Sequence, residues 1–374
     1  MIKPLHYYLL ATGSWFLAYG IQGVMFAWLV TIVLRESPNM VGVAHMTLLA
    51  PATVLVLIGG SLADHFGGKP IAIIGQLLAA VCVFLLALVI YFDYFSYSTL
   101  LVFAFVLGCA QAIVTPARDG LLPLVASGRI QRTVVQSTIT QFGIMMLGFA
   151  IASFADQSGA LIILLFQSVV LLVGIVALVR IKVPGSKVPQ SDYNLTKQIR
   201  LSIYTGMQTV LGNSVLRAIL LINFAMGLFF MSSYMVMIPL LLREVYGGSS
   251  SQLSWTNFAN CLGLVLMMFY LLRMGDLKRQ GRGLLLSHGI GAIALAGVAL
   301  GTGFISLMVG VFVWGLAGGL SVTASRSIAQ ELSPPGQRGR VMAFFSFSFM
   351  AAGPIGALFS GFMAGWLGPA IALL

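Results

Sequence analysis

A short hydrophilic stretch, Gly59–Pro70, separates two long apolar runs of this chain. Residues 41–58 are apolar apart from His45 and a few small polar or proline positions, and residues 71–92 are apolar apart from Gln76. Each run approaches or exceeds the roughly 20 residues that a helix needs to cross a bilayer. Because the connection is so short, we expect the two runs to form antiparallel membrane helices.

Comparable apolar runs continue to the end of the chain. Hydrophobic residues make up 59% of the 374 residues and charged residues 8%, whereas soluble domains carry about 25% charged residues. The sequence therefore predicts an all-α polytopic membrane protein with 11 complete spans and a truncated twelfth. Residues 367–374 are too short to cross a bilayer at about 1.5 Å per residue, which favours a sequence fragment over the loss of the last helix. The predicted spans are 7–34, 40–63, 70–92, 97–117, 133–155, 160–180, 216–242, 253–273, 284–304, 306–327 and 341–366.

The positive charge of the chain follows the predicted topology. If the N-terminus is cytoplasmic, 18 of the 20 lysine and arginine residues lie in cytoplasmic segments, and only Arg35 and Arg243 lie on the other side. The cytoplasmic loops of membrane proteins carry such an excess of lysine and arginine. The net charge of +11 therefore indicates orientation and contact with anionic lipids, and no nucleic-acid partner is expected.

Two bundles and a linker are predicted from the distribution of helix breakers. Proline, glycine and serine interrupt the chain after Val183. The segment Leu195–Leu211 has an apolar stripe that is typical of an amphipathic helix on the membrane surface. The predicted domains are an N-terminal bundle at 1–183, a cytoplasmic linker at 184–214 and a C-terminal bundle at 215–374.

The second half of the chain repeats the first at an offset of 208 residues. The shared offset covers a five-residue segment, an arginine and a glycine, which together indicate a duplication. The aligned pairs are Val114–Arg118 with Val322–Arg326, Arg132 with Arg340, and Gly148 with Gly356.

Polar and aromatic side chains inside the predicted spans are candidates for lining an internal cavity. An unpaired amide is costly in the hydrocarbon region, so such a group either faces a cavity or bonds a neighbouring helix. For Gln22 both alternatives stay open. His45 is the one histidine expected in the hydrocarbon region, and a structural role is favoured over titration. The candidate cavity residues are Trp15, Tyr19, Gln22, Gln111, Gln141, Asn223, Tyr234 and Asn260.

The sequence offers no enzyme site, and neither a cofactor nor a metal is expected. All nine acidic residues fall in or near loops and the four histidines are scattered, so no catalytic set or metal cluster shares one depth. Cys82, Cys109 and Cys261 lie in apolar runs and are expected to pack there without forming disulfides. A Walker loop for ATP is also missing from the sequence.

The stretch Gly60–Lys69 has the pattern Gly-x-Leu-Ala-Asp-x-x-Gly-x-Lys. It resembles the loop between the second and third helices of the major facilitator superfamily. Three further stretches are similar to one branch of this superfamily, which contains bacterial enterobactin exporters and macrolide efflux proteins. They are Thr115–Val125, Ile238–Gly248, and Ser333–Val341 followed by Gly353–Gly356.

This resemblance implies two pseudo-symmetric six-helix bundles that alternate access around a central site. It also implies that a loop on the inner side locks one conformation, with Arg118 as the partner of Asp64. The residues of this inner lock are Gly60, Asp64, Gly67, Lys69 and Arg118, and their second-half counterparts include Arg326 and Arg340.

Two features of proton-driven relatives are missing. Residues 107–111 of the fourth span lack the arginine that many drug exporters carry, and residues 141–155 lack the Gly-Pro pair that is typical of antiporters. An embedded carboxylate is the usual proton relay. Because none is visible, the sequence does not identify the residue that would carry a coupling ion.

The leading hypothesis is a secondary active transporter of the bacterial inner membrane that exports a small amphiphilic molecule of the drug or siderophore class. Its expected partners are this molecule, a coupling ion (expected to be a proton) and membrane lipids, and the chain is expected to be a monomer. One alternative is a lysophospholipid flippase. A second, from another class, is a non-transporting membrane sensor or scaffold.

Overall fold

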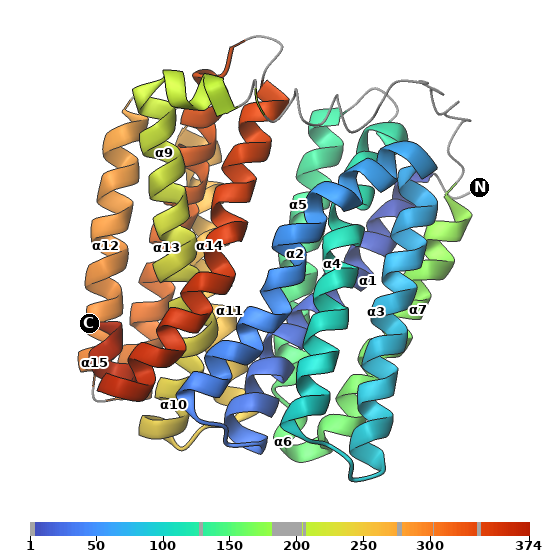
Figure 1. Ribbon diagram of the computed structural model, residues 1–374, viewed down its shortest axis with the longest axis vertical. Coiled ribbons are helices and arrows are strands. Elements are labelled where there is room, and N and C mark those ends of the chain that lie inside the picture. The colour runs from blue at the N-terminus through green and yellow to red at the C-terminus, as the bar shows by residue number, and fades with distance from the viewer. Residues whose placement is uncertain are drawn as a thin grey trace. The chain divides into compact units, whose positions relative to one another are not determined.

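The computed structural model consists of helices throughout the residues that it describes (Figure 1), which confirms the predicted all-α fold class. The side chains of residues 56–65, 130–132 and 338–340 lie outside this description. The backbone is described for residues 4–126, 130–181, 204, 207–274, 279–301, 303–334 and 338–374.

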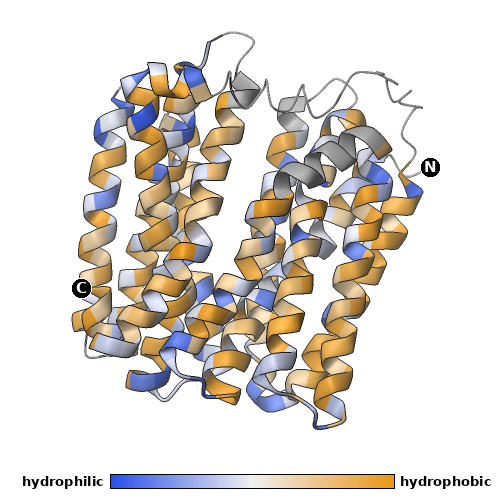
Figure 2. Cartoon of the chain, viewed as in Figure 1, coloured by the Kyte–Doolittle hydropathy of each residue, from blue (hydrophilic) through white to orange (hydrophobic). Residues whose placement is uncertain are grey.

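Ten helices in these ranges are long and apolar enough to cross a membrane, and they coincide with ten of the predicted spans. The remaining predicted span, 40–63, falls on α2 (Pro38–Phe66), whose side chains are described only in part. The count of 11 spans with a truncated twelfth therefore stays a prediction. Figure 2 shows hydrophobic residues along the helices and hydrophilic residues at many of their ends.

The chain forms two compact units, each of which is discontinuous in sequence. Unit 1 comprises Met1–Val188 with Pro239–Phe258, and unit 2 comprises Pro189–Ile238 with Ala259–Leu374. The predicted division kept 215–374 in one block, so the grouping of residues 239–258 with unit 1 was not anticipated. The predicted amphipathic helix lies mostly outside the described residues.

The long helices of unit 1 pack against one another in pairs, and the third also packs against the seventh. The first helix packs against the fifth and seventh, and the fourth packs against the second and third. Its elements are α1 (Pro4–Trp28), the π-helical turn η1 (Leu29–Val33), α2, α3 (Gly68–Tyr91), α4 (Tyr97–Val125), α5 (Ile130–Ala152), α6 (Ala155–Ser158) and α7 (Ala160–Arg180), with α10 (Ile238–Tyr246) and the start of α11 (Ser250–Met274).

Unit 2 contains the same kind of packing, with α12 against α13 and α14 against α9 and η2. Two consecutive π-helical turns lie between α9 and α10. Such turns carry one extra residue per turn and are frequent at functional sites. The elements of unit 2 are α9 (Ser214–Ala225), η2 (Met226–Met231), η3 (Ser233–Met237), the rest of α11, α12 (Gln280–Leu300), α13 (Phe304–Glu331), α14 (Arg338–Leu367) and α15 (Pro369–Leu373).

Gly148 and Gly356, which the duplication aligns, have equivalent roles in the two units. A Cβ atom on Gly148 of α5 would overlap the carbonyl oxygen of Leu17 in α1. A Cβ atom on Gly356 of α14 would overlap the carbonyl oxygen of Leu228 in η2. Small residues allow the backbones of membrane helices to approach this closely, so each glycine sets the distance between two helices of its unit.

Replacing Gly148 by alanine should destabilise unit 1 by about 1–3 kcal/mol, because the added methyl group forces α1 and α5 apart. Gly143, on the same helix, is the matched control, since a Cβ atom there meets nothing within 4 Å. Thermal unfolding of the purified protein in detergent checks both variants. Equal unfolding temperatures for the two variants would contradict the close-packing role.

A hydrogen-bonded cluster attaches the hairpin 239–258 to the rest of unit 1. Asp156 of α6 accepts hydrogen bonds from Trp28 Nε1 at 2.8 Å and from the backbone N–H of Ser250 at 2.6 Å. Ser250 is the first residue of α11, so the carboxylate satisfies an N–H group that has no partner within its own helix. Arg243 of α10 donates to the carbonyl oxygen of Glu36. The hairpin is thus bonded to two segments of the N-terminal half.

Replacing Asp156 by asparagine should lower stability by about 1–2 kcal/mol. One of the two oxygens that accept from Trp28 and Ser250 becomes an NH₂ group, which can only donate. Asp93→Asn is the matched control, since Asp93 is exposed at the end of α3 and asparagine tolerates its positive φ of 59°. The measurement is the unfolding temperature followed by circular dichroism. A loss of the same size in the control would show that general charge, not this cluster, is responsible.

Candidate functional site

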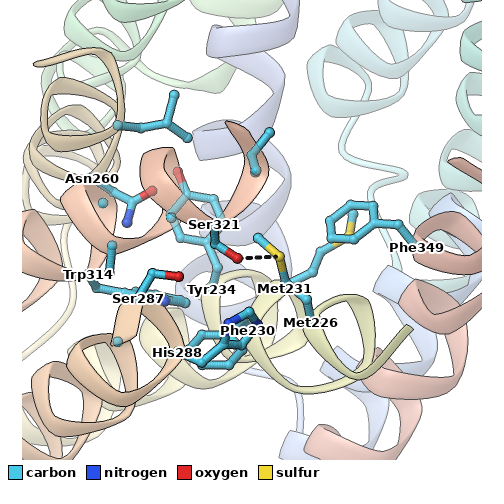
Figure 3. A pocket seen from close by; sticks show the side chains of 16 residues that line it. Met226, Phe230, Met231, Tyr234, Asn260, Ser287, His288, Trp314, Ser321 and Phe349 are labelled. Carbon is cyan, nitrogen blue, oxygen red and sulfur yellow. Dashed lines mark hydrogen bonds between the residues drawn. The ribbon is translucent and has the colours of Figure 1, made fainter. Parts of the chain in front are cut away.

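Unit 2 encloses a cavity of about 160 Å³ whose walls are largely aromatic and thioether side chains. The lining residues come from the π-helical turns and from four further helices, α11, α12, α13 and α14 (Figure 3). The first π-helical turn, η2, contributes Met226, Phe230 and Met231, and η3 contributes Tyr234. The six large apolar side chains are Met226, Phe230, Met231, Tyr234, Trp314 and Phe349.

The ring of Trp314 contacts two other rings of the cavity wall. The ring centroids of Phe230 and Trp314 are 6.1 Å apart, and those of Tyr234 and Trp314 are 6.0 Å apart. Phe230 also contacts the ring of His288 in a T-shaped arrangement, with the ring centroids 5.7 Å apart. Figure 3 shows His288 and Phe230 side by side. Contacts at these distances fix the ring orientations, so the apolar wall is preformed.

Few polar atoms reach this cavity, and the residues described along its wall carry no carboxylate, lysine or arginine. Asn260 donates through Nδ2 to the carbonyl oxygen of Val311 at 3.2 Å. Ser321 Oγ lies 3.6 Å from Met226 Sδ, the contact dashed in Figure 3. Ser287 donates to Leu284 O at 2.7 Å. The cavity is therefore electrically neutral when His288 is neutral.

His288 is the polar wall residue that the sequence analysis missed. Its Nδ1 lies 2.8 Å from the carbonyl oxygen of Leu284, and its Nε2 is buried with no hydrogen-bond partner in the part of the chain that the structure describes. The sequence places His288 only four residues inside the predicted span 284–304, a depth that looks interfacial. His288 lies three residues before Gly291 and shares a helical stripe with Ser287 and Gly291. This spacing is the signal that could have identified it.

Unit 1 contains a smaller cavity of about 20 Å³. Four of the predicted cavity residues line it, namely Trp15, Tyr19, Gln22 and Gln111. Gln167 of α7, which was not predicted, donates to Gln22 Oε1 at 3.0 Å and to Ala18 O at 3.1 Å. Gln22 therefore fits both alternatives, since it lines a cavity and bonds a neighbouring helix. The volume has room for about one water molecule.

The two cavities occupy equivalent places in the repeat. Four pairs of wall residues are separated by the same offset of 208 residues that relates the two halves of the sequence. The pairs are Ala18 with Met226, Gln22 with Phe230, Ala79 with Ser287, and Leu107 with Gly315.

Of the other predicted cavity residues, Tyr234 and Asn260 line the larger cavity, whereas Gln141 and Asn223 line neither. Asn223 is buried and donates through Nδ2 to Phe345 O at 2.7 Å and to Ser348 Oγ at 3.0 Å. Gln141 Nε2 lies 3.5 Å from Ser137 Oγ on its own helix. The structure thus gives Asn223 a helix-joining role.

The predicted inner lock can be located only in part. Gly67 has a φ of 87° between α2 and α3, a conformation that favours glycine. Lys69 donates to the carbonyl oxygens of Val179 and Ile181, both at 2.8 Å, and so caps the end of α7. The side chains of Asp64 and Arg340 and the surroundings of Gly60 lie outside what the structure describes, and Arg326 is exposed.

Arg118 is buried in unit 1, with 4% of its surface exposed. Its guanidinium carbon lies 4.6 Å from the centre of the Phe16 ring, an attractive cation–π distance. Its Nε and Nη1 atoms form no hydrogen bond within the described part of the chain. Two donors of a buried cation are therefore available in this conformation.

Replacing Asn223 by leucine should lower stability by about 1–3 kcal/mol, because Phe345 O and Ser348 lose a buried donor. Gln111→Leu is the control, since Gln111 lines the smaller cavity and should change stability by less than about 0.5 kcal/mol. Unfolding temperatures and transport are measured for both. A stable Asn223→Leu variant with altered ligand preference would instead place Asn223 in the cavity wall.

Comparisons with known proteins agree with this architecture. The family model described as Major Facilitator Superfamily matches residues 8–357. The nucleoside transporter NupG superimposes with a TM-score of 0.76 at 13% identity, covering 100% of this chain and 95% of that one. A bacterial homologue of the human lysosomal transporter Spinster, in an inward-facing and unoccupied conformation, gives 0.71 at 15% identity, covering 97% and 83%.

A third structure is similar over almost its whole length. A POT family transporter in complex with 5-aminolevulinic acid superimposes with a TM-score of 0.71 at 14% identity, covering 99% of this chain and 92% of that one. No curated protein matches the sequence significantly. At these identities the structural likeness shows the fold alone.

Proposed function

The chain belongs to the Major Facilitator Superfamily, and from this premise we propose that it is a secondary active transporter that exports a small, uncharged amphiphilic molecule. Membership makes the chain a membrane transporter of the alternating-access kind, not an enzyme. The substrate class, the direction and the coupling ion are proposed here. The observation that carries the proposal is the neutral, ring-lined cavity of unit 2.

The chemistry of this cavity favours an uncharged amphiphile. Moving an ionised group out of water without a counter-charge is costly, and the cavity wall offers none. The rings of Phe230 and Trp314 present large apolar faces, and the flexible thioethers of Met226 and Met231 adapt to different shapes. A few polar atoms, such as those of Asn260, orient the ligand. Molecules of the drug or siderophore class combine these apolar and polar parts.

We propose export driven by a proton gradient, in the bacterial inner membrane, with a cytoplasmic N-terminus and a monomeric chain. The direction rests on the resemblance of Thr115–Val125, Ile238–Gly248 and Ser333–Val341 to exporters. The orientation rests on the 18 basic residues that the predicted topology places on one side.

The inner lock is a further part of the proposal. Arg118 is buried, and its Nε and Nη1 atoms have no partner among the residues that the structure describes. A guanidinium pairs strongly with a carboxylate. Asp64 is the carboxylate that the loop motif supplies. Lys69, which caps α7, holds this loop to the last helix of the N-terminal half.

An efflux experiment tests the proposal. Cells that lack their own exporters and express the full chain are loaded with dyes, macrolides and catecholate siderophores, with and without a protonophore. We expect retention of at least one compound to fall on expression and to rise again when the proton gradient collapses. Phe230→Leu should weaken that transport about 10-fold, the effect of losing one aromatic contact of about 1.4 kcal/mol.

Phe229→Leu is the matched control, because Phe229 lies on the same π-helical turn but is half exposed and outside the cavity. It should transport as the unaltered protein does, at equal expression. No efflux of any compound would overturn export of this class. Equal losses in both variants would overturn the assignment of the cavity as the substrate site.

A further inference from the structure

The hairpin 239–258 is bonded to unit 1, but the chain continues from both of its ends into unit 2. The chain enters the hairpin at Pro239, directly after η3, and leaves it after Phe258, inside α11. Alternating access requires one bundle to move against the other. Such a movement must either break the bonds between the hairpin and unit 1 or bend the chain at both of these points.

The bonds between α6 and the start of α11 are reciprocal. The carboxylate of Asp156 accepts a hydrogen bond from the backbone N–H of Ser250 at 2.6 Å, and Ser250 Oγ accepts one from the backbone N–H of Asp156 at 3.1 Å. Each side chain thus caps the helix that carries the other. Trp28 Nε1 donates to the second carboxylate oxygen of Asp156 at 2.8 Å. We refer to Trp28, Asp156 and Ser250 as the reciprocal cap.

The reciprocal cap can open without leaving polar groups unbonded. Asp156 is exposed, whereas Ser250 is fully buried while the cap is formed. Both residues lie at the ends of long spans, where water can reach them. Water can therefore replace the bonds of the cap when the hairpin moves away, so the net cost of opening is small.

Bending α11 is the costlier alternative. At about 1.5 Å per residue, Phe258 lies roughly 12 Å beyond the start of this helix. The helix is uninterrupted from Ser250 to Met274 and contains no proline. A bend at Phe258 would break backbone hydrogen bonds in the hydrocarbon region, where no water replaces them. The reciprocal cap is thus the weaker of the two connections.

The predicted topology places the reciprocal cap on the outer side of the membrane. Of the basic residues, only Arg35 and Arg243 fall on that side. Arg243 belongs to the hairpin and donates to the carbonyl oxygens of Thr31 and Glu36. These bonds add a second connection, so the outer end of the hairpin is closed onto the N-terminal half.

We propose that the reciprocal cap is the latch of the outer gate and that Asp156 is the residue that positions the hairpin in the closed state. When the transporter opens outward, the hairpin leaves Trp28 and Asp156, and water bonds Asp156 and Ser250 instead. Removing the carboxylate shifts the equilibrium toward the outward-open state. The inference rests on superfamily membership and alternating access, and it is independent of the proposed substrate, direction and coupling ion.

The test measures how fast a cysteine at position 31 reacts with a membrane-impermeant maleimide added outside intact cells. Thr31 is fully buried. The hairpin covers its segment, because Arg243 donates to Thr31 O and Gly248 lies against Ile32. The full chain carries Thr31→Cys, and its three native cysteines are replaced by alanine. We expect Asp156→Asn to raise the reaction rate about 10-fold, the effect of losing one hydrogen bond to a charged group.

Two variants separate opening of the latch from a general loss of stability. Gly148→Ala should destabilise unit 1 by a similar amount without touching the reciprocal cap, because its added methyl group meets Leu17 O. Asp93→Asn removes another exposed carboxylate of unit 1. Neither variant should change the reaction rate of the cysteine.

A cross-link tests whether the latch opens during transport. Asp156→Cys and Ser250→Cys replace two residues whose side chains reach each other's backbone N–H groups, so oxidation can join them by a disulfide. We expect the oxidised double variant to stop exporting the compound that the efflux experiment identifies, and reduction to restore export. Oxidation should not affect export by either single variant.

An unchanged reaction rate in Asp156→Asn, or an equal rise in Gly148→Ala, would overturn the inference. Undiminished export by the cross-linked protein would show that α11 bends while the cap stays closed. Failure of the disulfide to form would contradict the pairing of Asp156 with Ser250. Because labelling needs no substrate, absence of export by the unaltered chain would count against the proposed function alone, and the labelling rates would still decide on the latch.

Discussion

The hydrocarbon core of a membrane offers no hydrogen-bond partners, and this constraint determines where polar side chains lie in both units. Gln76, which interrupts an otherwise apolar helix, donates to Ser14 Oγ at 3.1 Å and to Leu171 O at 2.9 Å and so joins three helices. Asn223 joins two helices of unit 2 in the same way. Other buried polar atoms find no partner among the described residues, and Nε2 of Gln22 and Nε2 of His288 are two of them.

Duplication explains why the two units meet this constraint with related solutions. The aligned residues Gly148 and Gly356 each bring a fifth helix of the repeat against the backbone of a first helix. With the helices set at these distances, the wall residues of the two cavities fall at equivalent positions of the repeat. The positions of the cavities are thus properties of the helix packing, and their chemistry is determined by the side chains that each half carries there.

The spans were predictable because length and apolarity alone define them, and helical stripes brought Trp15, Tyr19 and Gln22 together correctly. Other features depend on tertiary contacts that a period of 3.6 residues does not reveal. The π-helical geometry of Met226–Met231 and Ser233–Met237 is an example. The attachment of residues 239–258 to unit 1 through Asp156 is another. Phe230 shares a helical stripe with Tyr234 in the sequence, whereas His288 looked interfacial.

The difference between the two cavities follows from the side chains at equivalent positions. Leu107 lines the smaller cavity of unit 1, whereas the equivalent Gly315 of unit 2 packs against the backbone of Asn260. The bonded amides of Gln22 and Gln167 also line the smaller cavity. His288 stands at the repeat position of Ala80, a buried residue whose carbonyl oxygen accepts from Ser168 of α7. A position that is a buried alanine in the first half is thus a titratable ring in the second half. That ring belongs to the wall of the larger cavity, so an imidazole lines the cavity of one repeat and not the cavity of the other.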